Sequence, residues 1–239
     1  MVELISGLQA PVVAANLDRI AAEIHDARIH APQAPPGLHR GGVEILAATK
    51  YVAAEELPVL AEAGVRLVGE NRAQDLERKH ALHGGLFEWD FIGALQSRKV
   101  RVIAPLVRPL ASGAGESALR ALERALDTAR PGPRILIEVN VSGERSKAGV
   151  APEQLDALIA RSPVEVAGLM TMPPFSADPE ASRPHFAALR ALADERGLEQ
   201  LSMGTSQDYL VAVEEGATIV RIGTGLYRAA RADAADTNG

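Results

Sequence analysis

One of the four lysines in the sequence, Lys50, stands where an amine could react with a ligand. Lys50 ends the segment EILAATK, whose short apolar run predicts a buried strand. In a parallel barrel the active sites form at the C-terminal ends of the strands. A partly buried amine at such a strand end can condense with an aldehyde. A lysine that only extends from a strand end into solvent is the alternative that position alone leaves open.

The other three lysines lack such a position. Lys79 lies in DLERKH on the polar face of a predicted helix, and Lys99 lies in LQSRKVR at the start of another. Lys147 lies in the loop-like segment GERSKAG. We therefore predict that all three are solvated charges.

A second group of candidate residues lies between Leu201 and Arg228, where two predicted strands end in small residues. The turns MGTS and RIGTG each precede a predicted helix. Small residues let backbone N–H groups approach a ligand, and a helix N-terminus favours a phosphate. Ser206, Gly223 and Thr224 are therefore candidates for a phosphate site in the last two β/α loops, a frequent arrangement in barrels. Ordinary helix capping is the alternative for either turn alone.

Two further polar residues stand at predicted strand ends. Arg221 lies within the last apolar run, and a buried arginine needs an acceptor, which could be a ligand or a structural carboxylate. Asn71, in GENRAQD, could contact a ligand or act as a helix N-cap. The six histidines show no metal-ligand spacing, and no Ser-His-Asp order is visible. We predict neither a metal site nor a hydrolytic triad.

These candidates must be positioned by elements that alternate along the chain. Apolar residues from Val12 to Ile24 follow helical spacing and predict an N-terminal amphipathic helix. Short apolar runs predict strands at residues 44–49, 66–69, 88–92, 106–110, 134–140, 165–170, 200–203 and 218–222. Helical patterns include residues 53–63, 116–129, 152–160, 179–196 and 206–215.

Near-continuous apolar runs such as RILIEVNV are typical of parallel strands that are covered on both faces. Eight β/α units in succession predict an α/β fold, a single TIM-like (β/α)8 barrel with an extra N-terminal helix. An open doubly wound sheet is the alternative. We expect residues 1–230 to form one domain and the Ala/Asp-rich residues 231–239 to be a disordered tail.

Composition limits the classes of function. The 239 residues carry a formal net charge of −6, which argues against coating a nucleic acid or an anionic membrane surface. The chain has no cysteine, which excludes disulfides, thiolate catalysis and zinc sites built on sulfur. No stretch reaches the ~20 apolar residues of a membrane span. We expect a soluble cytoplasmic protein, a monomer with no nucleic-acid or membrane partner.

Several segments, in this order, resemble the pyridoxal phosphate homeostasis protein family, single-domain relatives of the N-terminal barrel of alanine racemase. The matching segments are AATKY, VGENRAQD, WDFIGALQSRK, IEVNVSGERSKAG, VAGLMTM, LSMGTSQD and VEEGATIVRIGTGLY. They run from Leu46 to Tyr227, so the resemblance covers most of the chain.

The resemblance implies that pyridoxal 5′-phosphate (PLP) is held as a Schiff base on Lys50. It also implies a role for each remaining candidate: Ser206, Gly223 and Thr224 hold the phosphate, Asn71 lies beside the cofactor ring, Met203 helps to form the pocket wall, and Arg221 faces the pyridine nitrogen. An arginine cannot give up its proton to that nitrogen. The ring then remains unprotonated there and is a weaker electron sink.

The chain departs from the family pattern at several positions. Asp90 stands where a histidine is usual, Arg98 where asparagine is usual, Thr205 for methionine and Gln207 for aspartate, and Tyr227 and Arg228 replace Phe-Gly. None of these changes removes Lys50, Ser206, Arg221 or Thr224. They bear on the loop after the third strand and on the rim of the phosphate site.

After the last β/α unit only a short tail follows, where alanine racemase has a second domain that supplies an opposing base. Racemisation needs an acid/base group on each face of the substrate. We therefore expect a carrier that takes part in intracellular PLP homeostasis and serves PLP-dependent apo-enzymes. One alternative is a minimal PLP-dependent amino-acid racemase with Tyr51, Tyr209 or Tyr227 as base. Another is a phosphate-ligand barrel without a Schiff base.

Overall fold

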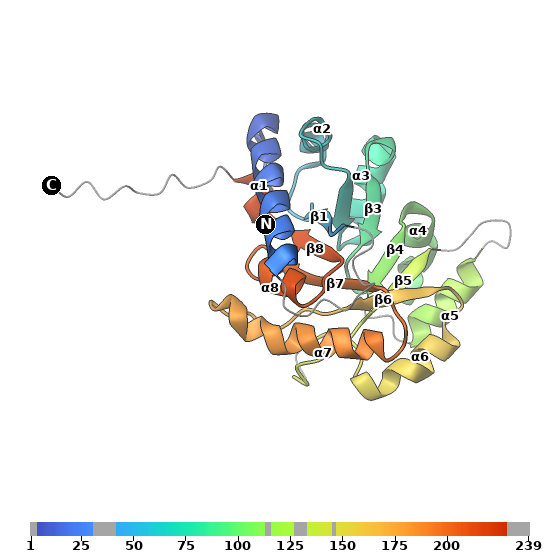
Figure 1. Cartoon of the computed structure of the whole chain (residues 1–239). Helices are drawn as coiled ribbons and strands as arrows, with labels where there is room; N and C mark the ends of the chain where they lie inside the picture. Colours follow the sequence, from blue (N-terminus) through green and yellow to red (C-terminus); the bar gives the residue numbers. More distant parts are fainter. Residues whose placement is uncertain (1–3, 31–41, 113–115, 127–132, 145–146, 229–239) are drawn as a thin grey trace.

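Eight parallel strands form a closed barrel in the computed structural model, which describes residues 4–30, 42–112, 116–126, 133–144 and 147–228 (Figure 1). The strands follow in chain order: β1 (Glu44–Ala48), β2 (Leu67–Glu70), β3 (Glu88–Phe91), β4 (Pro109–Ser112), β5 (Arg134–Glu138), β6 (Val166–Met170), β7 (Gln200–Thr205) and β8 (Ile219–Ile222). Pairing of β1 with both β2 and β8 closes the barrel. The predicted TIM-like barrel is therefore confirmed, and the open sheet is excluded.

The fourth strand lies later in the chain than predicted. Residues 106–110 were expected to be the strand, but Leu106 ends a short 3-10 turn (Ala104–Leu106) that begins beside a proline. In the segment PLVRPLAS, apolar residues flank Arg108 on both sides, so hydrophobicity alone cannot choose between them. Pairing with β5 selects the second half, with Leu110 opposite Ile135.

The helices surround the barrel as an outer layer (Figure 1). They are α1 (Ala10–His30), α2 (Leu57–Glu62), α3 (Ala73–His83), α4 (Val100–Ile103), α5 (Glu116–Ala125), α6 (Leu155–Arg161), α7 (Arg183–Asp194), α8 (Tyr209–Glu214) and α9 (Thr224–Tyr227). The last helix is a single turn, and α1 packs against α8, α9 and α2. The extra N-terminal helix thus completes the ring where α9 is too short to do so.

Two hydrophobic clusters reflect the alternation of side chains along each strand. The larger cluster lies between the barrel and the helices and includes Val68, Ile137 and Val220. The smaller one comes only from strands and the residues beside them, and it fills the barrel interior; its buried members are Leu46, Leu67, Leu136, Ala167, Met170 and Ile219. Because alternation fixes which residues face inward, it also decides which polar side chains reach the end of the barrel.

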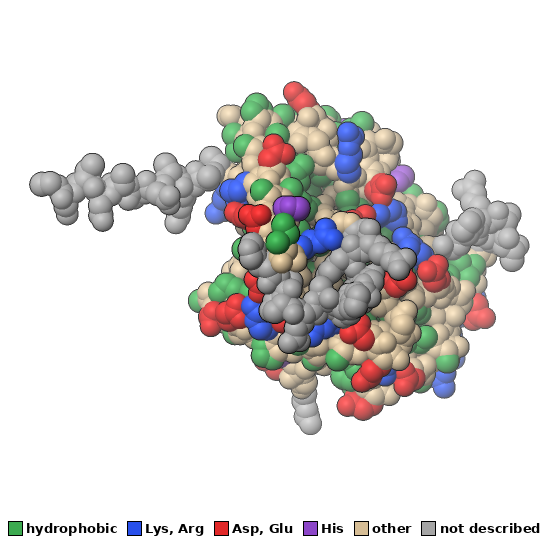
Figure 2. Space-filling view, viewed as in Figure 1, with side chains coloured by type: hydrophobic (Ala, Val, Ile, Leu, Met, Phe, Trp, Pro, Cys, Tyr) green, Lys and Arg blue, Asp and Glu red, His purple; other side chains and the backbone are tan. Residues whose placement is uncertain are grey.

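The surface carries charges of both signs. Figure 2 shows acidic and basic side chains interspersed with apolar ones on the face drawn. Within the described ranges, no helix is both long and apolar enough to cross a membrane. The predicted tail, residues 231–239, and the end of the predicted helix at residues 127–129 lie outside the described residues.

Candidate functional site

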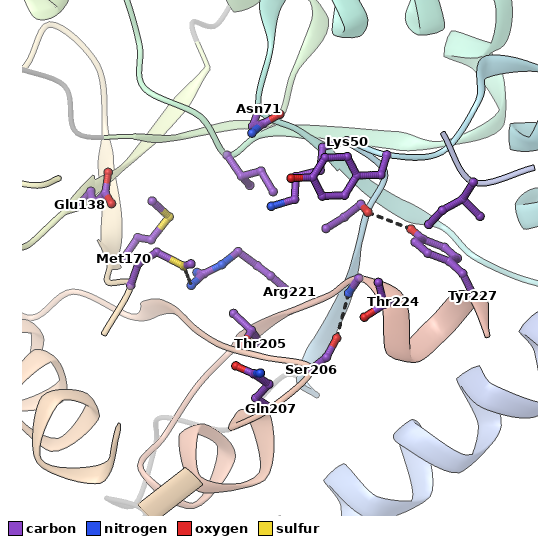
Figure 3. Close-up of a pocket in the computed structure, with 16 residues that line it drawn as sticks. Lys50, Asn71, Glu138, Met170, Thr205, Ser206, Gln207, Arg221, Thr224 and Tyr227 are labelled. Carbon is purple, nitrogen blue, oxygen red and sulfur yellow. Dashed lines mark hydrogen bonds between the residues drawn. The ribbon is translucent and has the colours of Figure 1, made fainter. Parts of the chain in front are cut away.

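A cavity of about 430 Å³ opens at the C-terminal ends of the strands, where a barrel builds its sites (Figure 3). Among the residues that the structure describes, its walls come from the ends of β1, β2, β3, β5, β6, β7 and β8, and Ile5 of the N-terminal segment also lines it. The structure brings six of the seven predicted site residues to this cavity: Lys50, Asn71, Ser206, Arg221, Gly223 and Thr224. Met203 is the exception.

Lys50 lies in a tight turn directly after β1. The carbonyl of Thr49 accepts a hydrogen bond from the N–H of Val52 (2.8 Å), so Lys50 is the first of the two central residues of the turn. Its side chain is half-buried and extends into the cavity, with Nζ 5.0 Å from the centre of the Tyr51 ring (Figure 3). An amine held in this way is accessible to a small carbonyl compound and sheltered on one side.

Ser206, Gly223 and Thr224 meet where β7 and β8 end. Ser206 Oγ accepts a hydrogen bond from the N–H of Gly223 at 3.1 Å (Figure 3). The turn after β7 depends on Gly204, whose φ is +89° and whose Cβ would lie 2.6 Å from Cβ of Ala212. Only glycine combines this conformation with such close packing against α8. The result is a cup of small, polar residues that suits an anionic group.

Arg221 supplies a buried positive charge at the cavity wall. Its guanidinium donates to the carbonyl (2.7 Å) and hydroxyl (2.7 Å) of Ser202, to the Thr171 carbonyl (2.9 Å) and to Met172 Sδ (2.9 Å). Burial lowers the pKa of Arg221 to about 10, and the negative charges of Glu138 and Asp208 oppose this shift. The guanidinium therefore stays charged at neutral pH.

Asn71 presents an unused acceptor. Its Oδ1 is buried and has no hydrogen-bond partner among the described residues. The N-cap position of α3 belongs to Arg72, so Asn71 does not have the capping role that the sequence left open. A buried acceptor without a partner costs about 1–3 kcal/mol. A donor group on a ligand would remove that cost.

Met203 was expected to form part of the pocket wall, but the structure places it elsewhere. It is fully buried in the cluster between barrel and helices. Side chains alternate along β7, so Ser202, which contacts the inward-facing Arg221, and Met203 point to opposite faces. The methionines at the cavity are instead Met170 and Met172. Because Ser202 faces inward toward Arg221, the alternation along β7 would have predicted that Met203 faces outward.

Six lining residues had no role predicted from the sequence, and two of these stand at the ends of β5 and β6. Glu138 and Met170 are the last residues of β5 and β6, and both line the cavity (Figure 3). The available signal was position, because both end predicted strands or lie within two residues of their ends. Among the departures from the family pattern, Thr205, Gln207 and Tyr227 also line the cavity, whereas Asp90 and Arg98 do not.

Lys79 was predicted to be a solvated charge, and this prediction is wrong. Its side chain is 1% exposed and ion-pairs with Glu70, Nζ to Oε1, at 2.5 Å. The spacing carried the missed signal: Ala73, Leu76 and Lys79 follow one another at intervals of three and form the buried stripe of α3. The pair lies behind the turn that holds Lys50, since Lys79 Nζ also donates to the Thr49 carbonyl (2.8 Å).

The three tyrosines differ in their freedom to act as bases. Tyr227 donates from its hydroxyl to the Ala48 carbonyl (3.1 Å), and burial together with the charge of Glu70 raises its pKa far above the usual value. Tyr209 does not line the cavity; its hydroxyl bonds to Glu23, and burial raises its pKa to about 12. Tyr51 lines the cavity and is 39% exposed.

Taken together, the geometry fits a small ligand that carries both an anionic group and a carbonyl group. The cup formed by Ser206, Gly223 and Thr224 suits the anion, and Lys50 suits the carbonyl. Arg221 lies on the wall between them, and Asn71 lines the wall on the other side of Lys50 (Figure 3). Among the described residues, no group of three or more histidine and acidic side chains could hold a metal ion.

Comparison with known sequences points the same way. The model of the family "Alanine racemase, N-terminal domain" matches residues 16–231. A pyridoxal phosphate homeostasis protein of Aquifex aeolicus is 40% identical over 195 residues, 77% of this chain and 86% of that protein. One from Pseudomonas aeruginosa is 37% identical over 224 residues, 91% of this chain and 95% of that protein.

Solved structures agree. PipY of Synechococcus elongatus with PLP bound is 28% identical, with a TM-score of 0.72 over 90% of this chain and 100% of that one. Alanine racemase of Corynebacterium glutamicum is 16% identical, with a TM-score of 0.63 over 95% of this chain and 63% of that one. The second likeness concerns the fold alone.

Proposed function

The chain belongs to the alanine racemase N-terminal domain family, among the pyridoxal phosphate homeostasis proteins, and we propose that it binds PLP as a Schiff base on Lys50 and takes part in intracellular PLP homeostasis. The observation that carries this proposal is the position of Lys50, whose amine lies in the same cavity as the cup of Ser206, Gly223 and Thr224. PLP carries an aldehyde and a phosphate, which match the Lys50 amine and the cup.

Each lining residue has a separate task. Ser206, Gly223 and Thr224 would bind the phosphate through hydroxyl and backbone N–H groups. Asn71 would accept a hydrogen bond through its unpartnered Oδ1. Bound PLP supplies an aldehyde that links to amines and a ring that can withdraw electrons. Arg221, which is protonated at neutral pH, gives no proton to a ring nitrogen, so it limits the second of these capacities.

The tyrosine geometry supports a carrier over a racemase. Tyr209 lies outside the cavity, and the Tyr227 hydroxyl is buried and donates to a backbone carbonyl. Of the three tyrosines proposed as bases, Tyr51 alone lines the cavity with an exposed ring. Racemisation needs a second acid/base group on the substrate face opposite the linking lysine, whereas the Tyr51 ring lies beside the Lys50 amine, 5.0 Å from it. PLP-dependent apo-enzymes would be the receivers of the cofactor. We further propose that the chain acts as a monomer.

The test is the absorbance spectrum of the PLP-treated protein before and after borohydride reduction, followed by peptide mapping. We expect a visible band that borohydride removes, with the label on Lys50. Lys50→Ala should lose the reducible band, whereas Lys99→Ala, which alters a lysine outside the cavity, should keep it. A label on another lysine, or none, would contradict the proposal.

A second measurement separates carrier from racemase. The PLP-loaded protein is incubated with single enantiomers of amino acids, and loss of optical activity is followed by circular dichroism. A carrier leaves the enantiomers unchanged over many equivalents. Turnover that disappears in Tyr51→Phe would instead favour the racemase.

A further inference from the structure

The backbone directly before Lys50 is held by buried side chains that do not reach the cavity. The Thr49 N–H donates to the Gly69 carbonyl (3.0 Å), and the Thr49 hydroxyl donates to Glu70 Oε1 (2.7 Å). Glu70 is the last residue of β2 and has no exposed surface. Through these two bonds the neighbouring strand fixes both the backbone and the side chain of the residue that precedes Lys50.

The Thr49 carbonyl is held by a second set of contacts. It accepts the N–H of Val52 (2.8 Å), which closes the turn around Lys50, and it also accepts Lys79 Nζ (2.8 Å) from α3. The same ammonium ion-pairs with Glu70 Oε1 at 2.5 Å. Two buried side chains, Glu70 of β2 and Lys79 of α3, therefore converge on the hydroxyl and carbonyl of Thr49, where the turn begins.

Stability alone is a weak explanation for this pair. Taking two charges out of water is costly, and an apolar pair of similar volume often serves the core equally well. Here the charges lie behind the turn, because neither Lys79 nor Glu70 lines the cavity. The pair instead supplies a directional contact, because a charge-assisted hydrogen bond restricts the orientation of the Thr49 carbonyl far more than apolar packing could.

We propose that Lys79 and Glu70 are positioning residues that hold the Thr49–Val52 turn so that the Lys50 amine stays aimed into the cavity. This inference rests on the proposed role of Lys50 as the linking amine. The inference separates two parts of the site. The phosphate contacts come from β7 and β8 and should not depend on the Lys79–Glu70 pair. The linkage to Lys50 should depend on it.

Two ligands distinguish binding by the phosphate cup from linkage to Lys50. PLP engages both the cup and Lys50, whereas pyridoxine 5′-phosphate carries an alcohol in place of the aldehyde and engages only the cup and walls. The variants are Lys79→Met, which removes the ammonium at similar length, and Thr49→Val, which removes the hydroxyl at similar volume. Arg78→Met makes the same kind of change at an exposed neighbour on α3 and is the matched control.

We expect Lys79→Met and Thr49→Val each to weaken PLP binding about tenfold, the scale of one charge-assisted hydrogen bond, and to slow labelling of Lys50 by borohydride. Binding of pyridoxine 5′-phosphate should stay unchanged, Thr49→Ser should recover PLP binding, and Arg78→Met should behave as wild type. Thr49→Val keeps the test decisive if Lys79→Met, which leaves Glu70 unpaired, does not fold.

Unchanged PLP binding in the folded variants would overturn the positioning role. Equal losses for both ligands would also overturn it, because they would indicate general damage to the barrel. Melting temperatures of the ligand-free variants supply an independent check on folding. Failure of the proposed function looks different: wild-type protein would then bind PLP without labelling Lys50.

Discussion

Ser206 and Lys50 line the same cavity and contribute different kinds of affinity. Lys50 offers a covalent linkage that only an aldehyde can use. Ser206 offers a hydroxyl in contact with the N–H of Gly223, and any phosphate-bearing ligand can use it. Affinity at this site should therefore divide into a part that depends on the aldehyde and a part that does not.

We predict that Ser206→Ala weakens PLP and pyridoxine 5′-phosphate by similar factors. A hydrogen bond to a charged group contributes about 1.5–3 kcal/mol, so the loss should be about tenfold or more for each ligand. Titration by fluorescence or calorimetry measures both affinities. Ser97→Ala, an exposed serine distant from the cup, is the control. A loss confined to PLP would assign the phosphate to other residues.

At the scale of elements, the sequence predicted most strands because each is a short apolar run bounded by polar turns. Lys50 and the cup residues could be placed at strand ends for the same reason, since parallel strands all end at one edge of a barrel. The fourth strand was misplaced because APLVRPLAS offers two apolar halves, and only pairing with β5 distinguishes them.

Side-chain direction was harder to predict than element position. Met203 and Lys79 both lie in elements that were predicted correctly. Met203, however, faces the helices instead of the cavity, and Lys79 faces the core instead of solvent. For Met203 the alternation of β7 decides. For Lys79 the decisive partner, Glu70, is nine residues away at the end of β2, and a charged residue on a buried stripe becomes credible only once its partner is known.

The N-terminal helix contributes to the site through one buried amide. Asn16 Nδ2 donates to the carbonyls of Leu226 (3.1 Å) and Arg228 (2.7 Å), which lie in and just after α9. These carbonyls end the single helical turn that begins at Thr224, so α1 caps the element that carries part of the phosphate cup.

We predict that Asn16→Ala lowers the free energy of unfolding by about 2 kcal/mol, because it removes two hydrogen bonds and leaves a buried carbonyl unpaired. Urea denaturation of the ligand-free protein measures the change. Asp18→Ala, at an exposed position on the same helix, should stay within about 0.5 kcal/mol of wild type. Equal stability of the two variants would show that α1 packs without this cap.

At the scale of the whole molecule, the two ends of the barrel do different work. The C-terminal end holds the ligand cavity, and the N-terminal end holds a charged cluster around Arg108. Arg108 pairs with Glu44 (2.9 Å) and Glu88 (2.8 Å), the first residues of β1 and β3, and with Asp90 (3.1 Å). In barrels of this kind the N-terminal end serves stability. The departure from the family at Asp90 therefore bears on folding and leaves the ligand site unaltered.

Asp90 should give the folded protein a distinctive pH dependence. Its side chain is 1% exposed, and burial raises its pKa from 3.8 to about 7, although Arg108 acts in the opposite direction. Because the folded state binds the proton more tightly than the unfolded state, the stabilisation is complete below pH about 4 and is lost as pH rises through about 7. At 1.36 kcal/mol per pKa unit, the effect is at most about 4 kcal/mol.

We therefore predict that raising the pH from about 5 to about 8 lowers the free energy of unfolding of the wild-type protein more than that of Asp90→Asn. Chemical denaturation at both pH values measures this change in the free energy of unfolding for each protein. Glu88→Gln alters a 61% exposed partner of the same Arg108 and should show nearly the same change with pH as the wild-type protein. PLP binding should be unaffected by either change, since Asp90 and Glu88 lie outside the cavity. Parallel stability profiles for wild type and Asp90→Asn would mean that Arg108 keeps Asp90 ionised throughout, and a loss of PLP binding would mean that the two ends of the barrel are coupled.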